Sequence, residues 1–171
     1  MPGDSEIKAE FEISTYDRAV PATLCGEIAK RVIKLRSSLI KAENGLVDTH
    51  GMEFERARSL KLTFNGSAGQ GFGVFLTPGV DITLYGEAND SVAKSMSGGK
   101  ITVRPALNSK LEAHKNSIIG NCALYGATGG KLFVSGLAGD RFAVRNSGAL
   151  AITEGTGLHA CEYMTNGTVI V

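Results

Sequence analysis

The sequence predicts an all-β solenoid of about five coils with one α-helix near its start. Three observations lead to this prediction. Glycine is abundant, at 22 of 171 residues. From residue 58 onward, the chain consists mainly of short apolar runs separated by glycines. Most of the glycines that precede these runs recur every 18 to 20 residues, a period short enough for one coil of a stacked array.

The composition favours a single domain over residues 1–171 of a cytoplasmic protein. The formal net charge of +1 gives no reason to expect nucleic acid or an anionic membrane as a partner. The polar N-terminus lacks the apolar centre of a secretory signal. Three widely spaced cysteines, Cys25, Cys122 and Cys161, show neither metal-binding nor disulfide spacing. We therefore expect reduced, buried thiols.

Residues 1–57 form an N-terminal segment with one predicted helix, over about residues 23–41. Thr23 is suited to begin this helix, and Asn44-Gly45 is suited to end it. Apolar residues recur at helical spacing along one face: Leu24, Ile28, Val32, Leu35 and Leu39. This single apolar stripe predicts that the helix packs as an N-terminal cap over the first coil.

Residues 58–171 carry the repeated pattern, which starts with the strand-like alternation of Leu60, Leu62 and Phe64. Each unit opens at a glycine and has a late glycine before its last apolar run. The opening glycines are Gly66, Gly86, Gly136 and Gly155, and the late ones are Gly79, Gly99, Gly130, Gly148 and Gly167. An insertion, "RPALNSKLEAHKN", explains the one long gap. Glycine accepts positive φ and close stacking, so these nine positions are predicted corner residues.

The stretch "FNGSAGQGFGVF" at residues 64–75 also raises the alternative of a nucleotide-binding loop. A dinucleotide fingerprint that starts at Gly69 or Gly71 needs a third glycine, but Val74 and Leu76 stand at those positions. The two "GGK" triplets lack the hydroxyl residue that a P-loop places after its lysine. The glycines therefore favour architecture over phosphate binding.

Four stretches carry a family resemblance: "STYDRAVPATLCGEIAKR", "LTFNGSAGQGFGVFLTPGVDITLYGEANDSVAKSMSGGKITVRP", "SIIGNCALYGATGGKLFVSGLAGDRFAVRNSGA" and "GLHACEYMTNGTVIV". In this order they resemble the C-terminal G-x-G-x-G domain of the glutamate synthase large subunit, and the separate small proteins that carry that domain alone. The resemblance implies a right-handed parallel β-helix. A related subunit occurs in formylmethanofuran dehydrogenase.

Few side chains suggest chemistry. His50, His114 and His159 are far apart, so surface or packing roles are favoured over metal binding. Asp17-Arg18 precedes the predicted helix, where a cap or an ion pair is favoured over catalysis. We therefore expect no catalytic, cofactor-binding or metal-binding residue in this chain.

Two further groups of side chains recur in the predicted coils. Asp90 and Asp140 take equivalent positions, where a carboxylate is suited to bond backbone groups at a corner. Arg141 and Arg145 share one side of a predicted strand. Together with Asn146 they form either a solvated face or a candidate partner surface.

The resemblance implies a non-catalytic structural subunit or domain of a glutamate-synthase-like oxidoreductase complex, in glutamate biosynthesis and ammonia assimilation. Its role would be to brace the amidotransferase and FMN-oxidoreductase parts, which partner chains would supply. The alternatives are the equivalent subunit of formylmethanofuran dehydrogenase and an independent ligand-binding β-helix. The β-branched run Val169 to Val171 also predicts that the last coil is covered by a partner or by a second copy.

Overall fold

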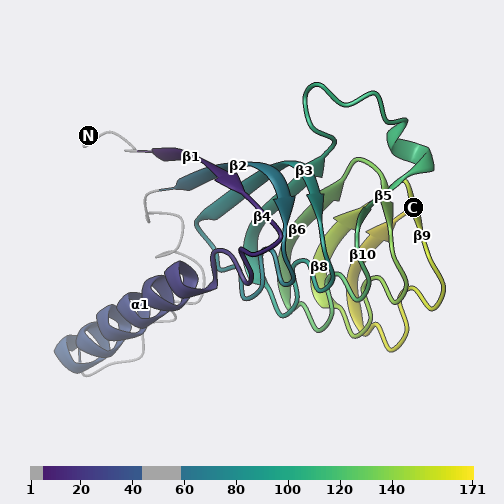
Figure 1. Ribbon diagram of the computed structural model, residues 1–171. Helices are drawn as coiled ribbons and strands as arrows, with labels where there is room; N and C mark the ends of the chain where they lie inside the picture. The colour runs from purple at the N-terminus through teal and green to yellow at the C-terminus, as the bar shows by residue number, and fades with distance from the viewer. Residues whose placement is uncertain (1–5, 44–58) are drawn as a thin grey trace.

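The computed structural model describes residues 6–43 and 59–171. The chain forms one parallel β-sheet that curls into a half-barrel, and one α-helix extends away from it (Figure 1). The elements in chain order are β1 (Ile7–Ile13), α1 (Ala22–Glu43), β2 (Leu60–Ala68), β3 (Val80–Ala88), β4 (Ser97–Arg104), the 3-10 helix η1 (Ala113–Lys115), β5 (Ser117–Ile119), β6 (Gly129–Val134), β7 (Leu137–Ala138), β8 (Ser147–Ile152), β9 (Gly155–Thr156) and β10 (Asn166–Ile170).

The sheet branches at β3. Strands β1, β2 and β3 pair along their length, with Ile7 opposite Leu60 and Leu60 opposite Val80. Beyond β3 the pairing divides, because residues 81–85 pair with β4 whereas Ala88 pairs with β5. One branch continues through β6, β8 and β10, and the other through β7 and β9. This division turns the sheet around the core.

The core follows from the register of the strands. Side chains that alternate along each strand fall into columns across the sheet, because paired residues point to the same side. One buried column runs through Leu62, Ile82, Ile101, Leu132 and Ala151. Phe72 and Phe142, from two of the connecting loops, are fully buried against these columns. The apolar runs of the sequence thus form one continuous core.

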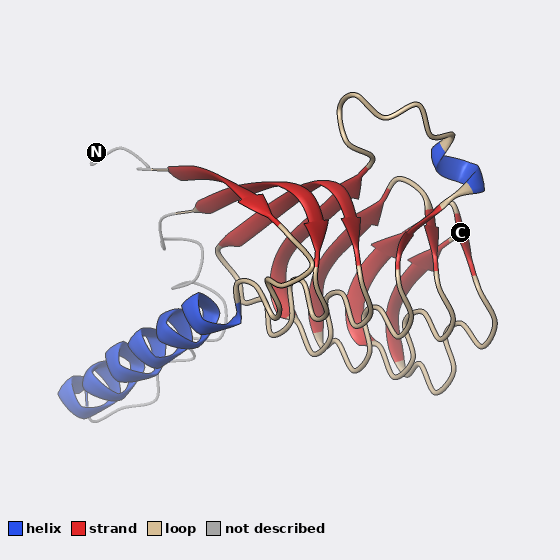
Figure 2. Ribbon diagram, viewed as in Figure 1, coloured by secondary structure: helices blue, strands red, loops and turns tan. Residues whose placement is uncertain are grey.

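The prediction of a right-handed parallel β-helix of about five coils is wrong. The described strands belong to one curled sheet, and the other side of the core is closed by loops rather than by further strands (Figure 2). These loops contain residues with positive φ at every second position. An extended strand requires negative φ throughout, so these segments have a different backbone and the expected multi-strand coils do not form.

The predicted N-terminal helix cap is also wrong. Strand β1 precedes α1 in the chain and covers the edge of β2, where the helix was expected. Its sequence, "IKAEFEI", alternates apolar and charged residues and therefore suits an edge strand. In α1, Cys25 is buried and Ile28 packs against the core, but Leu24 is 39% exposed. The helix then projects beyond the sheet (Figures 1 and 2).

An ion-pair group joins the start of β1 to β2. Glu6 lies 2.7 Å from Lys8 and also pairs with Lys61 of β2. Hydrogen bonds from Lys61 and Lys8, in that order of size, lower the pKa of Glu6 from 4.5 to about 2.

We expect β1 to loosen from the sheet in acid. The folded-state pKa of Glu6 lies below its unfolded value of 4.5, so its contribution is fully present above that pH and is lost as the pH falls through about 2. Hydrogen exchange of the β1 amides should accelerate in this window, relative to the β4 amides. Glu6→Gln should remove the difference, and Glu27→Gln, whose partner Lys30 is in the same helix, should not. Equal behaviour of all three chains would contradict this expectation.

Candidate partner-binding surface

Five loops on one side of the sheet share an unusual backbone. Each has positive φ at every second residue, as in Arg141, Ala143 and Arg145, with values of 56–59°. The corresponding residues of the other loops are Gly71, Gly73 and Phe75; Ser91, Ala93 and Ser95; Cys122, Leu124 and Gly126; and His159, Cys161 and Tyr163. The sequence signals this geometry only in the first loop, where glycines occupy two of the three positions.

Hydrogen bonds lock these loops together in both directions. The N–H groups of Arg141 and Arg145 donate forward, to the carbonyls of Leu158 (2.8 Å) and Glu162 (2.9 Å). The N–H of Ala143 donates backward, to the carbonyl of Ala123 at 2.9 Å. The same alternation occurs in the loops at Ser91 and Cys122. Each of these three loops therefore holds both of its neighbours.

A ladder of side chains runs along one end of the loops. Asp90 Oδ1 accepts the N–H of Asn121, Asn121 Oδ1 accepts the N–H of Asp140, and Asp140 Oδ1 accepts the N–H of Leu158, each at 2.8 Å. Equivalent positions of successive loops thus carry the short polar residues Asp90, Asn121 and Asp140. The ladder ends at Leu158, whose side chain is apolar. Asp90 and Asp140 bond the backbone, as the sequence suggested for them.

Of the three residues predicted to form a partner surface, the two arginines are exposed and Asn146 is not. Arg141 and Arg145 are exposed on one loop, although that loop is not the strand that the sequence suggested. Asn146 is fully buried. Its Nδ2 donates to the carbonyl of Ala149 (3.0 Å), and its Oδ1 accepts the N–H groups of Gly148 (3.2 Å) and Ala149 (2.9 Å). Asn146 is therefore a structural residue of the turn into β8, which leaves the two arginines as the exposed pair.

The other candidate residues have local partners. Asp17 Oδ2 accepts the N–H and the hydroxyl of Ser14, both at 2.9 Å, and these bonds lower the pKa of Asp17. His159 Nδ1 lies 2.8 Å from Glu162 Oε1, while His114 is exposed in η1. His50 lies outside the described residues. Within the described ranges, no cluster of three or more His, Cys, Asp or Glu side chains could hold a metal ion.

The three cysteines are free thiols. Cys25 is buried and the other two are half-buried. Burial raises the pKa of Cys25 and of Cys161, so these thiols resist ionisation.

The predicted corner glycines take several conformations. Seven have positive φ: Gly66, Gly79, Gly86, Gly99, Gly130, Gly136 and Gly167. The other two, Gly148 and Gly155, do not. At Gly148 an added Cβ would overlap the carbonyl of Thr128, so close approach rather than backbone conformation requires glycine there.

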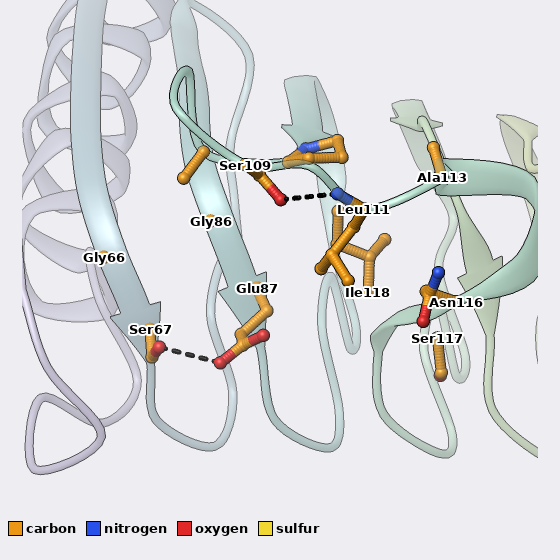
Figure 3. A pocket seen from close by; sticks show the side chains of 12 residues that line it. Gly66, Ser67, Gly86, Glu87, Ser109, Leu111, Ala113, Asn116, Ser117 and Ile118 are labelled. Atoms are coloured by element: carbon orange, nitrogen blue, oxygen red, sulfur yellow. Dashed lines mark hydrogen bonds between the residues drawn. The ribbon is translucent and has the colours of Figure 1, made fainter.

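A small cavity with a mainly apolar lining lies where the segment between β4 and β5 folds over the ends of β2 and β3 (Figure 3). Its volume is about 190 Å³, and the carboxylate of Glu87 lies at its edge, where it accepts a hydrogen bond from Ser67 at 2.9 Å. Ser109, Leu111 and Ile118 line the other side. The lining includes several hydrogen-bonding side chains. It contains a single carboxylate, that of Glu87, and no cationic side chain.

A larger, mainly apolar pocket of about 420 Å³ lies between β1, β2 and the start of α1. Phe11, which stacks on Phe64 with ring centroids 5.6 Å apart, is 48% exposed at its rim. Pro21 and Leu24 close the side next to the helix. Exposed apolar surface of this kind is typical of contact sites between protein parts. No described helix is long and apolar enough to cross a membrane.

These features define a glycine-rich domain built on a single curled parallel sheet, with exposed apolar and arginine-bearing faces. The chain belongs to the GXGXG motif family, whose model matches residues 2–171. It is 49% identical to the chloroplastic ferredoxin-dependent glutamate synthase of Spinacia oleracea over 165 residues, and this aligned region covers 96% of the chain.

Two further relatives are also glutamate synthases. The NADH glutamate synthase of Schizosaccharomyces pombe is 45% identical over 95% of the chain. A chloroplastic ferredoxin-dependent glutamate synthase of Arabidopsis thaliana is 45% identical over the whole chain. The chain spans only 7–9% of the length of these three relatives, so it corresponds to one small region of each.

Proposed function

We propose that this chain is a non-catalytic structural component of a glutamate-synthase-like assembly, which braces an amidotransferase part and an FMN-binding oxidoreductase part. Similarity over 95–100% of the chain to one region of glutamate synthases carries this proposal. The geometry supports it, since Asp17, Asp90 and Asp140 all bond nearby backbone N–H groups. The apolar pocket beside β1 offers one contact surface for a partner.

The test compares two sources of nitrogen. Amidotransferase and FMN-binding parts are reconstituted with and without this chain, and glutamate formation is measured with glutamine and with free ammonium. A brace that keeps ammonia from escaping between the two parts should raise the glutamine-driven rate and leave the ammonium-driven rate unchanged. Equal rates with and without the chain would contradict the proposal. Assembly with subunits of a formylmethanofuran-dehydrogenase type would favour the alternative function instead.

We further propose that the outer edge of β10 is covered in the assembly by a partner subunit or by a second copy. Within the described residues, β10 pairs only with β8. Ile170 and Val171 are 50% and 70% exposed there, and an open strand edge invites pairing with another chain.

For the isolated chain we expect association that increases with concentration, measured by sedimentation velocity. Ile170→Lys should reduce it, because a charged side chain disfavours pairing at an edge. Ile170 is a better position for this test than Val169, which packs against the core. Lys131→Glu, an exposed change on β6, serves as the control. A monomer at all concentrations would overturn the expectation.

A further inference from the structure

We propose that the exposed side of the loops binds a carboxylate-bearing segment of a partner protein. This proposal rests on the function proposed above, because it specifies how one part of the assembly would be held. The surface is formed by five side chains, here named the Arg–Tyr ridge: Lys94, Tyr125, Arg141, Arg145 and Tyr163.

The ridge is continuous because its loops are hydrogen-bonded in sequence. The carbonyl of Tyr125 accepts the N–H of Ser95 at 2.9 Å, and the carbonyl of Glu162 accepts that of Arg145 at 2.9 Å. Two cations lie over neighbouring aromatic rings. Lys94 Nζ is 5.7 Å from the Tyr125 ring centre, and Arg145 Cζ is 5.9 Å from that of Tyr163. Cations and rings therefore alternate along this side of the molecule.

The cations of the ridge lack carboxylate partners in the described part of the chain. Lys94, Arg141 and Arg145 form no salt bridge there. Two carboxylates of these loops already have donors. Asp140 Oδ1 accepts the N–H of Leu158, and Glu162 Oε1 lies 2.8 Å from His159 Nδ1. A carboxylate supplied by a partner would thus find cations that no carboxylate in residues 6–43 and 59–171 neutralises.

The backbone conformation of the two arginines determines which substitution tests the proposal best. Arg141 and Arg145 have φ of 59° and 56°, in the left-handed region where glycine is less strained than any other residue. Glycine stands at the equivalent positions Gly71 and Gly126 of two other loops. All five loops share this left-handed backbone, and non-glycine residues such as Ser91 and Cys122 adopt it too. Glycine is therefore the substitution that removes each arginine side chain without a backbone cost.

The chemistry of the ridge selects an acidic protein segment. Arginine binds carboxylates through two parallel hydrogen bonds, and exposed arginine and tyrosine are enriched at protein–protein contacts. A nucleic acid fits less well, because binding to it comes mainly from neutralising many regularly spaced phosphates, whereas the ridge offers three cations. The net charge of +1 also provides no broad positive field.

The test uses a synthetic octaglutamate peptide as the probe, titrated into the isotope-labelled chain at low salt and followed by NMR. The peptide should shift the amides of residues 141–145 and 163. The double variant Arg141→Gly/Arg145→Gly should weaken binding about tenfold or more, because two charge-assisted contacts are lost. Its melting temperature should stay unchanged or rise, because glycine relieves the left-handed strain. Weaker peptide binding together with an unchanged or higher melting temperature is expected of a binding residue. Loss of a purely structural residue would lower the melting temperature instead.

Arg104→Gly is the matched control. Arg104 is also exposed and lies 5.9 Å from a tyrosine ring, that of Tyr85, but outside the ridge. It should leave peptide binding within about twofold, since only charge-assisted contacts at the ridge are at issue. Equal losses in Arg104→Gly and the double variant would overturn the proposal. So would an absence of peptide binding, a lower melting temperature for the double variant, or tighter binding of a single-stranded oligonucleotide than of the peptide.

The outcome is separable from that of the proposed function. Peptide binding is measured on this chain alone, whereas bracing is measured in the reconstituted assembly. Arginine-dependent peptide binding together with failed reconstitution would preserve the ridge and reject the brace. Successful reconstitution together with arginine-independent peptide binding would reject the ridge alone.

Discussion

Gly99→Val is expected to destabilise the domain by about 3 kcal/mol or more, which combines the cost of a left-handed side chain with a steric overlap. Gly99 has φ of +73°, and an added Cβ would overlap the carbonyl of Val80 and lie 2.8 Å from that of Thr77. Both are backbone groups, one at the start of β3 and one just before it, so they cannot move aside as a flexible side chain could. Thermal denaturation followed by circular dichroism should show a fall of about 6–12 °C, or a chain that does not fold.

Three matched variants separate the two causes. Gly79 has φ of +85° but open space around an added Cβ, so Gly79→Val should show the backbone cost alone. Gly148→Val should show the steric cost alone, because its φ is not positive and an added Cβ would overlap the carbonyl of Thr128. Gly26 of α1 has neither restriction, so Gly26→Val should be nearly neutral. If the Gly99→Val and Gly26→Val variants had the same melting temperature, this account would be refuted.

Asn146→Ala is expected to cost about 2–4 kcal/mol, because it leaves buried backbone groups without partners. The lost amide bonds the N–H groups of Gly148 and Ala149 and the carbonyl of Ala149. Denaturant unfolding should show a lower midpoint, with a slope that stays close to that of the unchanged chain.

Asn121→Ala is the control for this variant. Asn121 is exposed and accepts one backbone N–H, that of Asp140, in the ladder. Water can replace that bond, so we expect a loss below about 1 kcal/mol. If the two variants unfold at the same denaturant concentration, burial of Asn146 is not the source of its contribution.

The family and the apolar columns could be predicted from the sequence, whereas the shape of the sheet could not. Leu62, Ile82, Ile101 and Leu132 stand out as evenly spaced apolar runs, and the structure stacks them in one column. The solenoid prediction failed because "RFAVR" has the alternation of a strand. Its arginines instead adopt positive φ, a conformation that their residue type disfavours.

The candidate surface was predictable only in part, for a related reason. Two arginines four positions apart in an alternating pattern indicated a shared side, and Arg141 and Arg145 are both exposed on one loop. The burial of Asn146 could not be predicted, because its turn into β8 is a tertiary feature. Lys94 and Tyr163 are 69 positions apart, and only the order of the strands brings their loops into one row.

The segment between β4 and β5, which lies outside the sheet, has a consequence for protein engineering. The chain leaves the sheet after Arg104, passes through η1 and re-enters at Ser117, and Ile119 still pairs with Ala88 of β3. The pairing of β3 with β4 and β5 therefore sets the strand register, and the residues between β4 and β5 do not determine it. Foreign epitopes or affinity tags grafted between Leu107 and Lys110 should be displayed without disturbing the half-barrel, and the loops on the opposite side should remain free to bind.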